Sequence, residues 1–232
     1  MLKIRKSSER GASKTSWLDS RHTFSFNDYY DPDESGFSVL RVINEDRVAP
    51  AGGFAPHSHR DMEIFTWVIS GALEHKDSLG NGSVIRPGDA QRMSAGVGVT
   101  HSEYNPSKQE PVHFLQIWIL PSRAGLAAGY EQRNFAEADR RGRLKLLASP
   151  DGADQSVHLN QDARLYGSTL ADRQSVSQAI GKGRRGYLHV VRGNVDGGGI
   201  KLGAGDGLKI ENEPKIDIAA AGDAEVLLFD LP

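Results

Sequence analysis

The stretch VHFLQIWIL, residues 112–120, carries five closely spaced apolar side chains, at Phe114, Leu115, Ile117, Trp118 and Ile119. Successive side chains of an extended strand point to opposite faces, so this density leaves neither face for water. The stretch therefore predicts a strand inside a β-sandwich or a β-barrel. Short segments of the same kind, rich in Val, Ile, Phe and Trp, occur at 37–43, 63–70, 186–191 and 225–231.

Helical patterns are scarce in comparison. Short helices are expected only around NFAEADRR (134–141) and LADRQSVSQAI (170–180). The fold class predicted from these patterns is all-β, with few short helices.

Strand and turn signals recur in the two halves of the chain. WVISGALEH (67–75) precedes IRPGDAQRM (85–93), and HVVRGNVDG (189–197) precedes KLGAGDGLKI (201–210). In each copy an apolar strand runs into a glycine, and a Gly-Asp pair follows later. DSLGNGS (77–83) and DGGG (196–199) predict hairpin turns. We interpret the repeat as two tandem antiparallel β-barrels, residues 1–125 and 126–232, with chance recurrence of Gly-Asp turns as the alternative.

Composition excludes several classes of function. The chain has 28 basic and 30 acidic residues and a formal charge of −2, which favours neither nucleic acid nor an anionic membrane. It has no run of 18 apolar residues, and MLKIRKSSERG at its start lacks the apolar stretch of a signal peptide. The absence of cysteine excludes disulfides, thiolate metal sites and a cysteine nucleophile. We expect a cytoplasmic protein that does not bind membranes or nucleic acid.

Two pairs of polar residues with the same spacing predict a metal site. His57 and His59 lie two residues apart, and so do His101 and Glu103. Residues i and i+2 of a strand share a face, so two neighbouring strands would offer four ligands to one point. Three imidazoles and one carboxylate suit a divalent first-row transition metal rather than calcium or magnesium. Four protein ligands on an octahedral ion leave two positions open for a substrate and a small molecule. The alternative to a metal site is that His57 and His59 are an ordinary polar pair on the exposed face of a strand.

Four other histidines, at 75, 113, 158 and 189, are expected to be structural or exposed. His75, within EHKD, is expected at a solvated strand edge. The second copy of the repeat contains no comparable ligand pair. We therefore expect one ion per chain.

These residues also carry a resemblance to a known family. PHSHRDMEIFTWVISG (56–71), together with GNGSVIRPGD (80–89) and GVGVTHSEYN (96–105), resembles the two motifs of the cupin superfamily. The usual cupin pattern would take its glutamate ligand from the first motif, here Glu63. MSAGVGVTHSEYNPS (93–107) instead resembles the pirin family, in which the glutamate two residues after the last histidine, here Glu103, completes the site. Residues 5–32 and 113–121 are also similar to bacterial pirin-like proteins of the quercetin 2,3-dioxygenase type.

The resemblance implies a bicupin, two double-stranded β-helices with metal only in the N-terminal barrel. It also implies a ring-cleaving dioxygenase that takes a flavonol such as quercetin and O₂ and releases carbon monoxide and a depside. Glu103 would be ligand and general base, and Glu63 no direct ligand. Iron is the expected metal, with Mn, Co, Ni, Cu and Zn as alternatives. Two other functions stay open: a non-enzymatic metal-binding regulator with a protein partner, and a cupin enzyme with another substrate.

Overall fold

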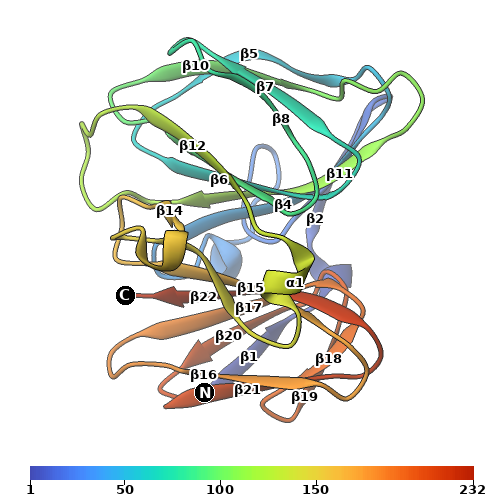
Figure 1. Cartoon of the computed structure of the whole chain (residues 1–232), viewed down its shortest axis with the longest axis vertical. Coiled ribbons are helices and arrows are strands. Elements are labelled where there is room, and N and C mark those ends of the chain that lie inside the picture. Colours follow the sequence, from blue (N-terminus) through green and yellow to red (C-terminus); the bar gives the residue numbers. More distant parts are fainter. The chain divides into compact units, whose positions relative to one another are not determined.

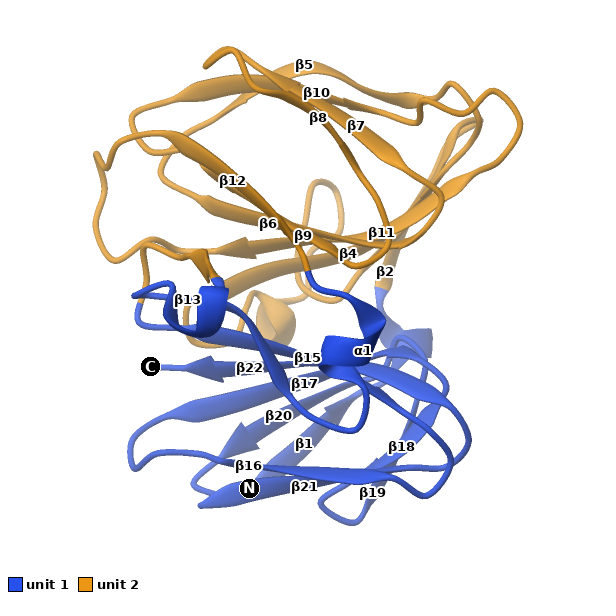
Figure 2. Cartoon of the chain, viewed as in Figure 1, with its two compact units in different colours: residues 1–10, 135–156, 162–232 blue, residues 11–134, 157–161 orange.

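The computed structural model describes all 232 residues and divides them into two compact units (Figures 1 and 2). Unit 2 comprises residues 11–134 and 157–161, and unit 1 comprises residues 1–10, 135–156 and 162–232. Both are built of antiparallel sheets, and the only α-helix is α1, Glu137–Arg140. Three 3₁₀ turns lie at Ser7–Glu9, Pro32–Glu34 and Ala153–Gln155. The predicted all-β class with few short helices is confirmed.

Unit 2 is built from two antiparallel sheets. The larger has seven strands in the order β12-β9-β6-β11-β4-β3-β2, and the smaller has four in the order β5-β10-β7-β8. The opening stretch forms β11, which pairs with β4 on one side and β6 on the other. The eleven strands of these sheets are β2 Gly11–Lys14, β3 Leu18–His22, β4 Leu40–Val48, β5 Gly53–His59, β6 Glu63–Ser70, β7 Leu73–Asp77, β8 Gly82–Ile85, β9 Asp89–Ser94, β10 Val99–Tyr104, β11 Val112–Ile119 and β12 Gly129–Asn134. The unit also contains the short strand β14, Val157–His158, which belongs to neither of these two sheets.

Unit 1 repeats this plan. Its larger sheet contains β1-β20-β17-β22-β15-β13 in that order, and its smaller sheet is β16-β21-β18-β19. β1 pairs with β20, so the first strand of the chain belongs to unit 1 together with the C-terminal strands. The predicted boundary at residue 125 would have placed this strand in the N-terminal barrel. The strands are β1 Leu2–Arg5, β13 Lys145–Ser149, β15 Arg164–Leu170, β16 Ser175–Ala179, β17 Arg185–Arg192, β18 Asn194–Gly197, β19 Ile200–Gly203, β20 Gly207–Glu211, β21 Lys215–Ala220 and β22 Ala224–Leu231.

The sequence repeat corresponds to equivalent turns in the two units. Gly71 follows the last residue of β6, and Gly193 follows the last residue of β17. Their φ angles are +79° and +76°. A Cβ at Gly71 would lie 2.7 Å from the Pro111 carbonyl oxygen, and at Gly193 it would lie 2.1 Å from that of Asp223. Left-handed backbone and close approach both require glycine at these positions. The repeated glycines therefore mark the same chain reversal in each unit.

The two helices expected from the sequence had different outcomes. The first is present as the single turn α1. The second, expected over 170–180, is wrong: β15 ends at Leu170 and β16 begins at Ser175. β16 pairs with β21 along its whole length, and its side chains alternate between exposed and half-buried. A turn around Arg173, whose φ is +64°, replaces the helix. Period-two burial and an available partner strand thus outweigh local helical propensity.

Apolar side chains fill unit 1 where unit 2 carries its polar pairs. By sheet order, β16 and β21 of unit 1 correspond to β5 and β10 of unit 2. Ile216 and Ile218 of β21 are buried in the apolar core, with Val176 of β16 packed against them. No group of three potential metal ligands occurs in unit 1. The structure contains no helix with the length and apolar character needed to cross a membrane.

Candidate metal centre

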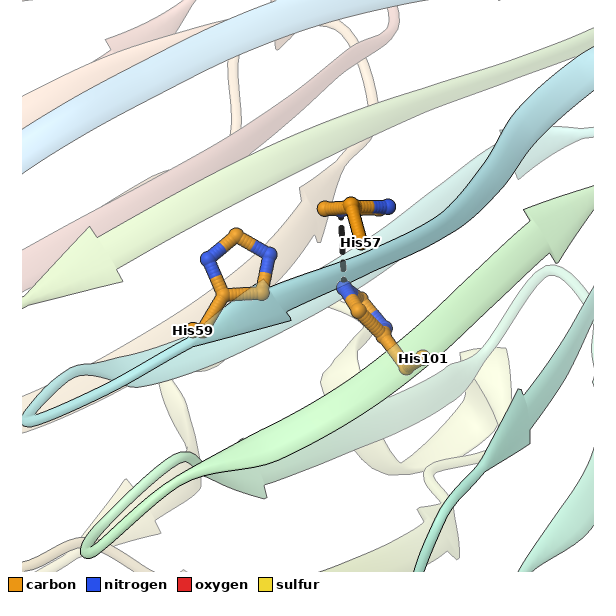
Figure 3. Close-up of side chains that lie close together, drawn as sticks. All are labelled: His57, His59 and His101. Atoms are coloured by element: carbon orange, nitrogen blue, oxygen red, sulfur yellow. Dashed lines mark hydrogen bonds between the residues drawn. The ribbon is translucent and has the colours of Figure 1, made fainter.

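Two neighbouring strands of the smaller sheet bring three histidines together in unit 2. β5 and β10 run antiparallel, with His101 opposite His57 and Val99 opposite His59. The Nε2 atoms of His57 and His101 are 3.1 Å apart, and one nitrogen from each of the three rings lies within 4.8 Å of the others. Figure 3 shows the three side chains gathered around one region, two from one strand and one from its neighbour. This separation is close to that between adjacent ligands on one ion.

Backbone irregularity supports this convergence. The pairing of β5 with β10 shifts register between His101 and Glu103, which lies opposite Phe54. β5 thus has an extra residue in the interval that contains Pro56, which cannot donate a ladder hydrogen bond. Such bulges re-aim side chains next to functional sites.

Hydrogen bonding and burial leave the imidazoles ready to bind a cation. Nδ1 of His57 lies 2.8 Å from the Ala55 carbonyl oxygen, which can only accept, so this nitrogen donates and Nε2 carries the lone pair. Burial, and secondarily the nearby imidazole of His57, lowers the pKa of His59 to about 4. Burial and the neighbouring His57 and His59 lower the pKa of His101 to about 3. Both rings are therefore neutral near pH 7, as metal binding requires.

Glu103 lies deeper, on the same strand as His101. It is 3% exposed, and Nε2 of Gln116 donates to both of its carboxylate oxygens, at 3.0 and 2.9 Å. Thr66 Oγ1 donates to Oε1 of Gln116 at 3.0 Å, which directs the amide nitrogen toward Glu103. A carboxylate oxygen of Glu103 lies within 4.8 Å of ring nitrogens of His101 and His75. His101 thus links Glu103 to the three-histidine cluster.

Burial raises the pKa of Glu103 to about 7, against the opposing effect of the Gln116 hydrogen bond. The carboxyl group of Asp46 raises it further. Asp46 is itself buried, and burial raises its pKa to about 7. Burial therefore favours the neutral form of both carboxyl groups, and a cation bound nearby would favour their ionised form.

His75 corrects an expectation from the sequence. It is fully buried rather than at a solvated edge. β7 is an inner strand between β10 and β8, and Leu73 and His75 share its buried face. Nδ1 of His75 lies 3.4 Å from Nδ1 of His101, and Nε2 lies 3.1 Å from Oδ2 of Asp77. The alternation of Leu73, His75 and Asp77 with the charged Glu74 and Lys76 was the available signal.

Glu63 lies on β6, in the larger sheet, and is buried. Its carboxylate accepts hydrogen bonds from Ser94 Oγ at 2.9 Å and from the backbone and side-chain nitrogens of Asn160 at 3.2 Å. It has no hydrogen bond to a histidine. These three donors satisfy the Glu63 carboxylate without a metal ion. That Glu63 does not bind the metal directly stays a prediction.

The other three histidines that were expected to be structural or exposed lie away from the cluster. His113 contacts Glu45 at 2.9 Å, His158 is exposed, and His189 is buried in unit 1. The expectation that these three are structural or exposed agrees with their positions.

A polar row that sequence patterns did not predict crosses the larger sheet of unit 2. Strand register places Gln91 beside Thr66, Thr66 beside Gln116, Gln116 beside Asn44, and Asn44 beside His22. All five are buried. Separate apolar clusters, one with Val68 and Phe114 and one with Ile64 and Met93, complete the interior. The interior of unit 2 thus contains a row of buried polar side chains between two apolar clusters. Glu103 is hydrogen-bonded to this row through Gln116.

Aromatic rings lie beside the histidine cluster. Trp118 packs edge-on to His59 with ring centroids 5.0 Å apart, and Phe26 packs edge-on to Trp118 at 5.4 Å. The Trp118 Nε1 atom is buried and has no hydrogen-bond partner. A cavity of about 360 Å³ borders His59 on the side of Ser58, Arg60 and Thr100. The cluster therefore combines an outer, half-buried side at His57 and His59 with a buried side at His101 and Glu103.

The raised pKa of Glu103 predicts a pH-dependent stability difference. Between pH 4.5, its ordinary pKa, and about pH 7, the folded metal-free protein holds a proton that the unfolded chain has lost. The free energy of unfolding therefore falls as pH rises through this window. Metal-free Glu103→Gln escapes that loss, so its stability relative to wild type should be higher at pH 8 than at pH 4.5, by on the order of 3 kcal/mol.

Urea unfolding in the presence of a chelator, at both pH values, measures this difference. The exposed Glu110→Gln variant serves as control and should show the same offset from wild type at both pH values. An offset for Glu103→Gln that does not change with pH would contradict the buried, protonated state of Glu103.

Comparison with known proteins agrees with the geometry. Residues 3–119 match the pirin family, and residues 146–231 match the quercetinase C-terminal cupin domain. A protein of Escherichia coli K12 named quercetin 2,3-dioxygenase is 49% identical over 233 residues, covering 100% of this chain and 99% of its own. A putative quercetin 2,3-dioxygenase of Pseudomonas aeruginosa is 43% identical, covering all of both chains.

Solved structures are similar over the same length. The crystal structure of YhhW from E. coli has a TM-score of 0.97 and 47% identity, covering 100% of this chain and 98% of its own. A structure of the bacterial pirin YhhW in complex with nickel(II) has a TM-score of 0.96 and 48% identity, covering 100% and 99%.

Two antiparallel barrels with a histidine and glutamate cluster in one of them define a cupin with a divalent-metal site. The matches to both halves, and the full-length relatives, make the assignment more specific. The chain belongs to the pirin family.

Proposed function

We propose that this pirin is a metal-dependent dioxygenase that opens the heterocyclic ring of flavonols such as quercetin with O₂, releasing carbon monoxide and a depside. The observation that carries the proposal is the buried Glu103 carboxyl group beside His101, one of three converging imidazoles. The names of the full-length relatives support the same substrate class.

His57, His59, His101 and Glu103 would hold one divalent ion, and iron is our prediction for the native metal. A bound ion lowers the pKa of a hydroxyl group attached to it. Glu103 would accept the proton of a flavonol 3-hydroxyl, since a bound cation favours the ionised form of a carboxyl group whose pKa burial otherwise raises. The amide nitrogen of Gln116 donates to both carboxylate oxygens of Glu103 and so fixes its orientation.

The surroundings of the cluster suit a flat aromatic substrate. Trp118 and Phe26 provide ring surfaces on the side of His59. The Nε1–H of Trp118 is buried without a hydrogen-bond partner, so a substrate carbonyl oxygen that reached it would gain a hydrogen bond. Aromatic packing with one well-placed polar group is typical of small-molecule sites.

Incubation with quercetin tests the proposal. The metal-loaded protein should consume O₂ and release carbon monoxide in air, and should leave quercetin unchanged under nitrogen. Protein stripped of metal provides the control. If loaded protein consumes no O₂ with any flavonol, the enzyme proposal fails and the metal-binding regulator becomes the better account.

A further inference from the structure

A buried hydrogen-bond chain leads from the histidine cluster to a hairpin turn. Its members are His101 on β10, His75 and Asp77 on β7, and Asn81 in the turn that joins β7 to β8. The His75 and Asp77 side chains are both 0% exposed, and His101 is 2% exposed. Buried polar groups of this kind need specific partners, because each unmade hydrogen bond costs free energy.

The far end of the chain is fixed by the turn. Oδ1 of Asp77 accepts from the backbone nitrogens of Leu79 and Asn81, at 2.9 and 3.0 Å, and from Nδ2 of Asn81 at 3.1 Å. Oδ2 accepts from Nδ2 of Asn81 at 2.9 Å. These bonds lower the pKa of Asp77 against the effect of its burial. An ionised carboxylate can only accept, so the remaining position on Oδ2 must receive a hydrogen.

The donor roles then follow in order toward the cluster. His75 Nε2, 3.1 Å from Oδ2 of Asp77, must be the protonated nitrogen. In the neutral imidazole the other nitrogen, Nδ1, is then an acceptor. His101 Nδ1, 3.4 Å away, is the atom positioned to donate to it. With its hydrogen on Nδ1, His101 would present a lone pair on Nε2, the nitrogen that lies 3.1 Å from His57 Nε2 inside the cluster. Two lone pairs facing one another in this way are compatible with a cation bound between them.

We propose that His75 and Asp77 are positioning residues that hold His101 in its Nδ1–H form, so that its Nε2 lone pair faces the metal. Histidine ligands in proteins commonly donate their second ring nitrogen to a fixed acceptor, and loss of that acceptor typically costs ~10–100-fold in metal affinity. Here the acceptor is a second imidazole, itself fixed by a carboxylate. His57 achieves the same result directly through the Ala55 carbonyl group.

The competing assignment makes His75 a metal ligand. One nitrogen of His75 lies within 4.8 Å of ligand atoms of His101 and Glu103. That arrangement would require a second ion, because Nδ1 of His101 faces His75 while Nε2 faces His57. The two assignments differ in stoichiometry, one ion per chain against two.

Asp77→Asn is the sharpest test. The three donors on Oδ1 would hold the amide oxygen there and turn the amide nitrogen toward His75. A donor at that point forces Nε2 of His75 to accept and its Nδ1 to donate, which reverses the roles along the chain. His101 would then carry its proton on Nε2, in the metal's place. The side chain keeps almost the same size, so the change acts mainly through the hydrogen bonds. We expect zinc affinity to fall ~10–100-fold.

His75→Phe is the second variant, and it removes the acceptor altogether. The double variant should bind zinc no more weakly than the poorer single variant, because both changes break one chain. Asp89→Asn is the matched control, since Asp89 also caps a turn in unit 2, accepting from Arg86 N at 2.9 Å, but has no contact with the cluster. Its zinc affinity should equal that of wild type.

Nitrogen-15 NMR of the imidazoles supplies a measurement that does not depend on metal or activity. This inference rests on the metal site of the proposed function, but the tautomer of His75 can be assigned in metal-free protein. We expect hydrogen on Nε2 of His75 in wild type and on its Nδ1 in Asp77→Asn; in zinc-loaded wild type, His101 should carry its hydrogen on Nδ1. Hydrogen on Nδ1 of wild-type His75, unchanged zinc affinity in both variants, or two zinc ions per chain would overturn the proposal. The expected His75 tautomer in a wild-type protein that binds no zinc would support the chain and contradict the proposed function alone.

Discussion

His57→Ala and His101→Ala proteins are expected to lose their bound metal while keeping their fold. Each change removes one of three nitrogens that lie within 4.8 Å of one another. The loss should exceed the ~10–100-fold typical of removing a side chain that only hydrogen-bonds to a ligand. The apolar clusters around Phe114 and Met93 do not include these histidines, so the sheets should persist.

Elemental analysis after gel filtration, with circular dichroism to check the fold, measures this. His113→Ala is the matched control, because His113 also lies on a strand of unit 2 but pairs with Glu45. Full metal content in both cluster variants would show that the ion lies elsewhere.

Glu103→Gln is expected to reduce flavonol turnover by ~10²–10⁴-fold, the usual contribution of a general base. The change keeps the size of the side chain and removes the carboxylate that would accept the 3-hydroxyl proton. Turnover should be compared at equal metal content, so that lost coordination and lost proton transfer are separated. Metal-loaded Glu103→Gln with wild-type turnover would remove Glu103 as the base.

Glu63→Gln provides the contrast, since Glu63 is another buried glutamate of unit 2 whose partners are Ser94 and Asn160. It should keep its metal. Loss of metal from this variant would favour the usual cupin ligand pattern over the pirin pattern.

Much of the fold could be predicted from local pattern. Dense apolar residues identified β6, β11, β17 and β22 to within one or two residues, because a strand buried on both faces needs them. The glycines of the repeat identified equivalent reversals, because left-handed backbone limits the choice of residue. The two-residue spacing of His57 and His59 predicted that they share one face of a strand, because period-two geometry needs no knowledge of register. The approach of His101 depended on the further assumption that its strand is a neighbour, and β10 does pair with β5.

Features that depend on pairing between distant strands were not predictable in this way. His75 reads as exposed until β7 is known to lie between β10 and β8. The strand β1 was not assigned to β20, about 200 residues later, by any local signal. The polar row through Gln116 exists only in the register of five strands, and none of its members is unusual in its own segment. Register is fixed by the packing of the whole unit.

The location of a bound ion tests the account most directly. Anomalous diffraction at the zinc edge, on crystals of protein loaded with zinc, should reveal one ion per chain, in unit 2. The account predicts ~2.0–2.2 Å from that ion to ring nitrogens of His57, His59 and His101 and to a carboxylate oxygen of Glu103. An ion held by Glu63 or His75, or an ion in unit 1, would contradict it.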